Sequence, residues 1–293
     1  MIGLIGGTGL GEALFGEAHA EERWIETPFG RPSSPVRLVE WHGLRVALLA
    51  RHGAGHVFNP SQAPYRANIY ALKTLGVTHV IASGAVGSLR EEIRPRELVV
   101  VDQVIDKTFR RTPTFFDDGL AAHVELAEPY CPALRETILS VAGGVDCRVH
   151  ARGTYVCMEG PAFSTRAESA LHRAWGGDLI GMTAMPEAKL AREAEMAYAL
   201  IALATDYDCW RPHEPGATPQ KLLEEIIGNL KAATANAVAL LRAAVSALAK
   251  DGLPASPAHD ALRLGIWTER GKITREVAAR YGALLARHID GAP

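Results

Sequence analysis

Two closely spaced carboxylates, Asp206 and Asp208, stand at the end of an apolar run that covers residues 198–205. In an extended chain, side chains two residues apart point to the same side. Because like charges in a partly buried place repel, one carboxyl would stay protonated near neutral pH and could donate to a leaving group. A metal site, a turn or a helix cap would use the same residues, and the segment alone leaves these alternatives open.

Three other segments carry hydrogen-bond donors. The first is Gly6-Gly7-Thr8-Gly9-Leu10, directly after an apolar run. Glycines let the backbone turn sharply and present N–H groups, and the Thr8 hydroxyl adds a donor, which suits a phosphate. The dinucleotide fingerprint requires glycine at position 12, where Glu12 stands, and no Gly-Lys-Ser/Thr follows. A simple tight turn is the alternative.

The second donor segment is Arg51-His52-Gly53-Ala54-Gly55-His56, after the apolar run 44–50. The planar fork of Arg51 suits bidentate contact with an oxyanion, and His52 can donate beside it. The His-x-x-x-His spacing also allows a metal site. A Gly-Ala-Gly insert forms a poor helix, however, and no Glu follows His52 as it does in zinc proteases, so metal is disfavoured. A solvated surface loop stays possible.

The third donor segment is Ser83-Gly84-Ala85-Val86-Gly87-Ser88, which we expect to be a loop after the strand 78–83. Open α/β sheets bind ligands beyond the carboxyl ends of their strands, where all three segments would meet. None of the three offers a carboxylate, so together they predict an anion site.

The elements that must position these residues alternate between strands and helices. Short apolar runs predict buried strands, and runs with helical periodicity lie between them. This alternation indicates an α/β fold with helices on both faces of a sheet. The expected strands are 1–5, 44–50, 78–83, 97–105, 178–182 and 199–205, and the expected helices are 61–75, 132–141, 164–175 and 186–196.

The C-terminal part is rich in Ala and Leu at helical spacing. We expect a long helix at 219–250, a break at 252–257 and a shorter amphipathic helix at 273–289. The expected domain covers residues 1–250, and residues 251–293 form a helical extension of it. The last helix could pack on a neighbouring subunit or on its own core.

Composition narrows the function classes. Lys and Arg total 31 against 33 for Asp and Glu, so a nucleic-acid partner has little support. The N-terminus lacks the pattern of a signal peptide, and the apolar stretches are too short to predict a membrane span. Four scattered cysteines, Cys131, Cys147, Cys157 and Cys209, favour a reducing cytoplasm. A small-molecule ligand is the expected partner.

In order and in sequence, these segments resemble the methylthioadenosine phosphorylase branch of the trimeric purine nucleoside phosphorylase family. The resemblance runs from about Ile2 to Trp210 and continues more weakly to the C-terminus. Further matches are Thr27-Pro28-Phe29-Gly30, Tyr65 with Ala67-Asn68-Ile69, Gly87-Ser88-Leu89-Arg90-Glu91-Glu92, Glu159-Gly160-Pro161 with Phe163-Ser164, Arg166-Ala167-Glu168-Ser169, and Met182-Thr183 with Pro186-Glu187.

The resemblance implies a single-domain α/β fold with a distorted mixed sheet, a homotrimer, no cofactor or metal, and inorganic phosphate as co-substrate. Position by position, it implies that phosphate is bound by Thr8, Arg51, His52, the backbone of Ala85, and Thr183. Met182 would lie under the ribose, and Phe163 and Ser164 would contact the base. His56, Pro219, Leu222 and Leu223 would lie near the 5′ substituent.

The implied reaction is attack of phosphate on the anomeric carbon of 5′-methylthioadenosine, which gives adenine and 5-methylthioribose 1-phosphate. A phosphate beneath a cation-like sugar stabilises its charge as well as attacking it. We assign proton donation at purine N7 to Asp206 and acceptance from the 6-amino group to Asp208, although the two could exchange roles. A carboxylate acceptor favours adenine over 6-oxopurines, and oxopurine-specific relatives tend to carry Asn where Asp206 stands.

The chain departs from the human-like branch of the family at Gly84, where that branch has Thr, at Gly181, where it has Asn, and at Pro64, where Asn commonly precedes the tyrosine. The nearest rival function is a phosphorylase for adenosine, inosine or guanosine. A hydrolase would need a carboxylate cluster near the sugar. A phosphate-binding protein without activity would explain the donor segments but gives no reason for Asp206 with Asp208.

Overall fold

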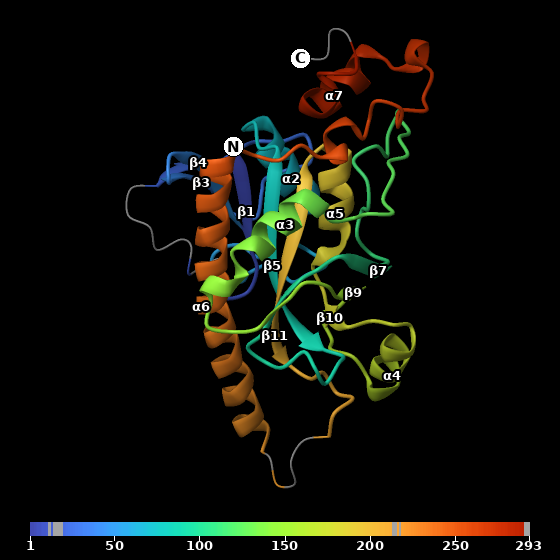
Figure 1. The fold of residues 1–293 in the computed structure, drawn as a ribbon. Coiled ribbons are helices and arrows are strands. Elements are labelled where there is room, and N and C mark those ends of the chain that lie inside the picture. The colour runs from blue at the N-terminus through green and yellow to red at the C-terminus, as the bar shows by residue number, and fades with distance from the viewer. Residues whose placement is uncertain (11–12, 14–19, 213–215, 217, 290–293) are drawn as a thin grey trace.

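The computed structural model describes residues 1–10, 13, 20–212, 216 and 218–289. Its centre is one mixed, twisted β-sheet with helices on both faces (Figure 1), which confirms the α/β class with a mixed sheet. The described strands are β1 Ile2–Gly6, β2 Glu21–Arg23, β3 Val36–Trp41, β4 Leu44–Ala50, β5 His79–Ser88, β6 Leu98–Val100, β7 Gln103–Lys107, β8 Val149–His150, β9 Thr154–Met158, β10 Leu179–Gly181 and β11 Ala197–Asp206.

The sheet runs in the order β2-β3-β4-β1-β5-β10-β9-β7, and β11 pairs with both β5 and β6. Strands β4, β1, β5 and β11 are parallel where they pair, whereas β10 is antiparallel to β5. Alternate residues of β11 enter two different hydrophobic clusters, one on each face of the sheet. A strand covered on both faces reads as a continuous apolar run, which explains why β1, β4 and β11 are visible in the sequence.

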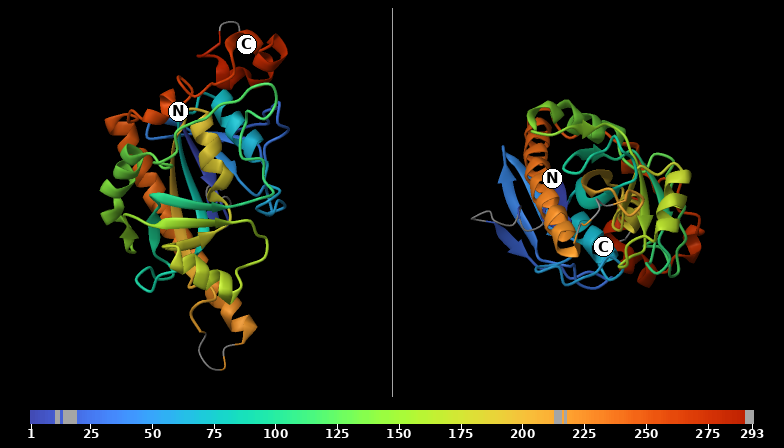
Figure 2. Two further views of the ribbon diagram at one scale, coloured as in Figure 1. Left: turned by 90° about the vertical axis from the view of Figure 1, so that its right-hand side faces the viewer. Right: turned by 90° about the horizontal axis from the view of Figure 1, so that it is seen from below.

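The helices are α2 Tyr65–Thr74, α3 Pro132–Ser140, α4 Arg166–Ala174, α5 Ala184–Glu193, α6 Pro219–Asp251 and α7 Arg275–Leu285. Helices α3 and α6 cover one face of the sheet, and α2, α5 and α7 contribute to the core on the other (Figure 2). Non-helical backbone at Met185 interrupts α5, so its regular part begins at Pro186, as expected from the sequence. The first turns of α6 extend beyond the sheet (Figure 1).

Helix α6 is long and apolar enough, by length and composition alone, to cross a membrane. Its buried side chains, however, belong to a core cluster with β1, β4 and β11, and they include Ala233, Ala237, Leu240 and Leu241. The helix is therefore a core helix of this fold.

Some strands differ from the sequence expectations. The expected strand 97–105 is two strands, β6 and β7, which pair with different partners, and β2, β3, β8 and β9 were not predicted. The interpretation of residues 83–88 as a loop is wrong: β5 continues to Ser88 because β11 pairs with it as far as Gly87 and β10 pairs with Gly87 and Ser88. The glycines at 84 and 87 therefore lie within a strand.

The division into residues 1–250 and a C-terminal extension of the same domain stays a proposal. It is supported by Leu262, Tyr281, Leu284 and Leu285, which are buried in the same cluster as side chains from β5 and β11. Helix α7 thus packs on the core of its own chain.

Candidate functional site

A cavity of about 1000 Å³ opens where five strands reach the same region of the molecule. Residues that follow β1, β4 and β10 line it, together with the second half of β5 and the end of β11. Because backbone and side-chain donors collect at the ends of parallel strands, this is the position in which an open α/β sheet binds its ligand.

A gap in the sheet forms one wall of the cavity. Strand β1 pairs with β5 as far as Ala82, and β10 pairs with β5 from Gly87 onward. On that edge, residues 83–86 have no strand partner in the described part of the chain. The Ser83 carbonyl points across this edge and accepts from the Arg51 side chain at 2.8 Å. In a strand, residues i and i+2 share an edge, so the Ala85 N–H faces the same gap.

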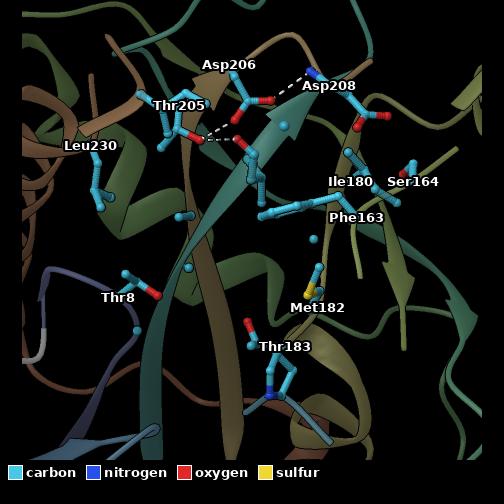
Figure 3. Close-up of a pocket in the computed structure, with 18 of the residues that line it drawn as sticks. Thr8, Phe163, Ser164, Ile180, Met182, Thr183, Thr205, Asp206, Asp208 and Leu230 are labelled. Atoms are coloured by element: carbon cyan, nitrogen blue, oxygen red, sulfur yellow. Dashed lines mark hydrogen bonds between the residues drawn. The ribbon is translucent and has the colours of Figure 1, made fainter. Parts of the chain in front are cut away.

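Thr8 and Thr183 lie at one end of the cavity and Asp206 and Asp208 at the other, with Met182 between them (Figure 3). Thr8 follows β1 in a turn, and Thr183 lies at the N-cap position of α5, where its side chain makes no capping hydrogen bond. The structure therefore brings all five expected phosphate-site residues, Thr8, Arg51, His52, Ala85 and Thr183, to this cavity.

Arg51 does not present a free fork to the cavity, which corrects the sequence interpretation. Its side chain is fully buried, and Nε and one terminal nitrogen donate to the two oxygens of Glu187 at 2.7 and 2.8 Å. Tyr198 donates to the same carboxylate at 2.8 Å. Although burial opposes it, Glu187 raises the pKa of Arg51 above its ordinary value. Each terminal nitrogen of Arg51 has a second N–H bond, and these two N–H groups can donate to a ligand.

His52 is held by the loop that follows it. Its Nδ1 lies 2.8 Å from the carbonyl oxygen of Phe58, and the Phe58 N–H donates to the His52 carbonyl. The His56 ring stacks on the His52 ring at 4.2 Å between centroids. Burial and the charge of Arg51 lower the pKa of His52 to about 4. Within the described residues no group of three His, Cys, Asp or Glu side chains could hold a metal ion.

The carboxylate end is built by a turn instead of an extended strand, which corrects the assumption that Asp206 and Asp208 lie in extended chain. Asp208 has a positive φ of 49°, and its N–H donates to Oδ1 of Asp206 at 2.7 Å. The hydroxyl of Thr205 contacts Oδ2 of Asp206 at 2.7 Å and the Val86 carbonyl at 3.2 Å (Figure 3). Oδ2 of Asp208 is buried without a hydrogen-bond partner in the described part of the chain, so a ligand donor there would satisfy it.

The expected substrate contacts divide into two groups. Met182, Phe163, Ser164, His56 and Leu222 line the cavity, with Phe163 largely exposed at 85%. Pro219 and Leu223 do not line it: α6 contributes residues 221, 222, 225, 226, 229 and 230 to the lining, and Leu223 is 58% exposed.

The sequence analysis did not identify the roles of Arg111 and Glu159, which support the part of the cavity formed by Met182 and Thr183. Arg111 is buried and donates to the carbonyl oxygens of Glu159, Met182 and Met185. Although burial opposes it, hydrogen bonds from Ser61 and from two backbone amides hold the pKa of Glu159 at about 2. Arg111 thereby joins its own segment to two others, around residues 159 and 182–185. No sequence motif surrounds Arg111 that could have pointed to this role.

Two of the departures from the family pattern have a steric basis. A Cβ on Gly181 would lie 2.0 Å from the Tyr155 hydroxyl, which accepts from the Thr183 N–H. A Cβ on Gly84 would lie 3.1 Å from Oγ1 of Thr183. Small residues at both places therefore let Tyr155 and Thr183 occupy this wall.

Comparison with known proteins agrees with this geometry. Residues 1–246 match the family model of the phosphorylase superfamily. The S-methyl-5′-thioadenosine phosphorylase of Synechocystis sp. is 46% identical over 100% of this chain and 89% of its own length, and that of Thermosynechococcus vestitus is 46% identical over 98% and 99%.

Solved structures give the same result. A methylthioadenosine phosphorylase from an antarctic soil metagenomic library superposes with a TM-score of 0.88 at 44% identity, covering 97% of this chain and 98% of that one. The enzyme of Schistosoma mansoni in complex with adenine gives 0.81 at 33% identity, covering 92% and 99%. The chain therefore belongs to the phosphorylase superfamily, in its S-methyl-5′-thioadenosine phosphorylase branch.

Proposed function

We propose that this cavity cleaves 5′-methylthioadenosine with inorganic phosphate, giving adenine and 5-methylthioribose 1-phosphate. One observation carries the proposal: anion donors and paired carboxylates occupy opposite ends of one cavity, with the apolar Met182 between them. Phosphate, sugar and purine follow one another in that order in the substrate complex. The names of the relatives support the same substrate.

At the donor end, the Thr8 and Thr183 hydroxyls, the Ala85 N–H and the outward N–H bonds of Arg51 bind phosphate, and His52 makes a further contact with it. A phosphate oxygen attacks the anomeric carbon while the bond from that carbon to purine N9 breaks. The electron pair passes to the purine ring. Because phosphate is anionic and preorganised beneath the sugar, it stabilises the positive charge that develops there.

At the carboxylate end, Asp206 donates a proton to purine N7, and Asp208 accepts a hydrogen bond from the 6-amino group. The unpartnered Oδ2 of Asp208 supports the acceptor role. The Thr205 hydroxyl has one proton and two oxygen neighbours, Asp206 Oδ2 and the Val86 carbonyl. It can therefore donate to Val86 when Asp206 is protonated and to Asp206 after the proton has left.

The 5′-methylthio group contacts His56 and Leu222, with Ile226 and Leu230 from the same face of α6 nearby in the lining. Lys221 and Glu225 of α6 line the cavity too, but the apolar side chains distinguish methylthio from hydroxyl by about 1–3 kcal/mol, so adenosine is expected to be a slower substrate. A 6-oxopurine nucleoside would place an acceptor against Asp208 and react poorly.

We also propose a cytoplasmic homotrimer. Phe109, Leu264 and Trp267 are 79%, 80% and 71% exposed in the single chain, and in the proposed trimer a neighbouring subunit covers them. All four cysteines are free, as a reducing compartment would leave them. A monomeric mass by light scattering would contradict the trimer.

Release of free base from methylthioadenosine, adenosine and inosine, each with and without phosphate, tests the proposed function. Phosphate-dependent release, fastest from methylthioadenosine, is the expected result. Fastest release from inosine would overturn the roles of Asp206 and Asp208, and the absence of any cleavage would leave a binding protein.

A further inference from the structure

The hydrogen bonds of His52 fix which of its ring nitrogens carries the proton. Nδ1 lies 2.8 Å from the carbonyl oxygen of Phe58, and a carbonyl can only accept. Nδ1 must therefore be the protonated nitrogen. Nε2 has no hydrogen-bond partner among the residues that the structure describes, and His52 lines the cavity. In the neutral ring Nε2 carries a lone pair, so it accepts hydrogen bonds, whereas the other groups of the proposed phosphate site donate them.

The charges around His52 favour the neutral ring. The titratable groups that act on it are Arg51, His56 and Arg111, and each opposes a positive charge on His52. The two arginines are themselves paired with carboxylates, Arg51 with Glu187 and Arg111 with Glu159. Burial adds to this effect, and the pKa of about 4 leaves the ring neutral at physiological pH.

Tetrahedral oxyanions differ in whether they can donate to such an acceptor. Hydrogenphosphate carries one hydroxyl and three bare oxygens at neutral pH, and hydrogenarsenate has the same arrangement. Sulfate carries four bare oxygens, so one of them would face the Nε2 lone pair without a proton between them. A site built around a donated hydrogen bond rejects an analogue that lacks the donor.

We propose that His52 is a specificity-determining residue that accepts a hydrogen bond from the hydroxyl of hydrogenphosphate and thereby disfavours sulfate. The inference rests on the proposed phosphate site and adds an orientation to it. The protonated oxygen of the nucleophile lies against His52, which leaves its bare oxygens for Arg51, Ala85, Thr183 and the anomeric carbon. Sulfate can bind only if His52 takes up a proton from solvent.

Calorimetric titration of the protein with phosphate, arsenate and sulfate tests this inference. At pH 8 we expect phosphate and arsenate to bind with similar affinity and sulfate at least a hundredfold more weakly. Between pH 8 and pH 6 sulfate affinity should rise close to tenfold per unit. Titrations in buffers of different ionisation enthalpy should show uptake of one proton with sulfate.

The variant His52→Gln supplies the matched test, because an amide can donate or accept. Its preference for phosphate over sulfate should fall below tenfold, and the pH dependence of sulfate binding should disappear. His123→Gln, a change at a histidine outside the cavity lining, should keep the wild-type preference. If His52→Gln does not fold, the wild-type titrations alone decide.

Equal binding of sulfate and phosphate by the wild type at pH 8, or sulfate binding without proton uptake, would refute the role of His52. An unchanged preference in a folded His52→Gln protein would refute it too. Phosphate-dependent adenine release, measured on the same samples, separates the two claims. If that activity is present, a failed sulfate test removes only this inference, whereas its absence together with absent phosphate binding removes the proposed site.

Discussion

Replacing Thr205 with valine should slow cleavage without weakening phosphate binding. The Thr205 hydroxyl lies 2.7 Å from Oδ2 of Asp206, and valine keeps its shape while removing that contact. The side chain is buried at the end of β11, where the Asn229 amide also donates to the Thr205 carbonyl at 2.9 Å. The backbone should therefore stay in place.

The size of the effect follows from the hydrogen bond that is lost. A hydrogen bond to a charged group contributes about 1.5–3 kcal/mol. If this contribution is made where the proton moves to the purine, kcat for methylthioadenosine falls by about 10-fold to 150-fold. Thr8 and Thr183 lie at the other end of the cavity, so the phosphate KM should stay within about twofold.

Steady-state kinetics with both substrates varied would measure these effects, and Thr205→Ser is the control that keeps the hydroxyl. We expect the serine variant to retain most of the wild-type kcat. A wild-type kcat in a folded Thr205→Val protein would contradict the role of Thr205. A rise in phosphate KM equal to the fall in kcat would show a general disturbance of the cavity instead.

Four further outcomes are expected. Asp206→Asn should lower kcat on methylthioadenosine and shift preference toward inosine; unchanged kinetics on both would end its assignment as donor. Arg51→Lys keeps the charge beside Glu187 but loses the paired geometry, so the phosphate KM should rise about tenfold or more, and a normal phosphate dependence would count against Arg51. Gly84→Ala should raise the phosphate KM several-fold by crowding the Thr183 hydroxyl; a wild-type value would show that the Thr183 side chain moves aside without loss of phosphate binding. Because the pKa of Glu159 in the folded protein is depressed to about 2, the ionised carboxylate stabilises the fold fully above about pH 4.5, and this stabilisation is lost as pH falls toward 2. It amounts to about 3 kcal/mol at most, so the difference in Tm between wild type and Glu159→Gln should shrink across that window, and a constant difference would refute the assignment.

The sequence allowed prediction of the features that are encoded locally. Strands β1, β4 and β11 are buried on both faces, so they appear as apolar runs, and the polar residues that follow them mark the cavity. Thr8, Arg51 and Asp206 were found in this way, each directly beyond or at the end of its strand.

The features that escaped prediction depend on partners distant in sequence. Glu187 stands in the first turn of the expected helix 186–196, where a carboxylate needs no partner, but it is fully buried against Arg51, 136 residues away. Ser83-Gly84 has the composition of a loop, yet the pairing with β11 keeps it in a strand. At Glu187 and at Ser83-Gly84, tertiary contacts override local propensity and pattern. The left-handed backbone of Asp208 is different, because it belongs to a local turn in which the Asp208 N–H donates to Asp206, two residues earlier.

The central claim is that phosphate, and not water, breaks the glycosidic bond. ³¹P NMR of a reaction with methylthioadenosine and phosphate tests it most directly, because it observes the fate of the nucleophile. We predict loss of inorganic phosphate and growth of one sugar 1-phosphate resonance, equal in amount to the adenine released. Adenine released with free methylthioribose and unchanged phosphate would contradict the account.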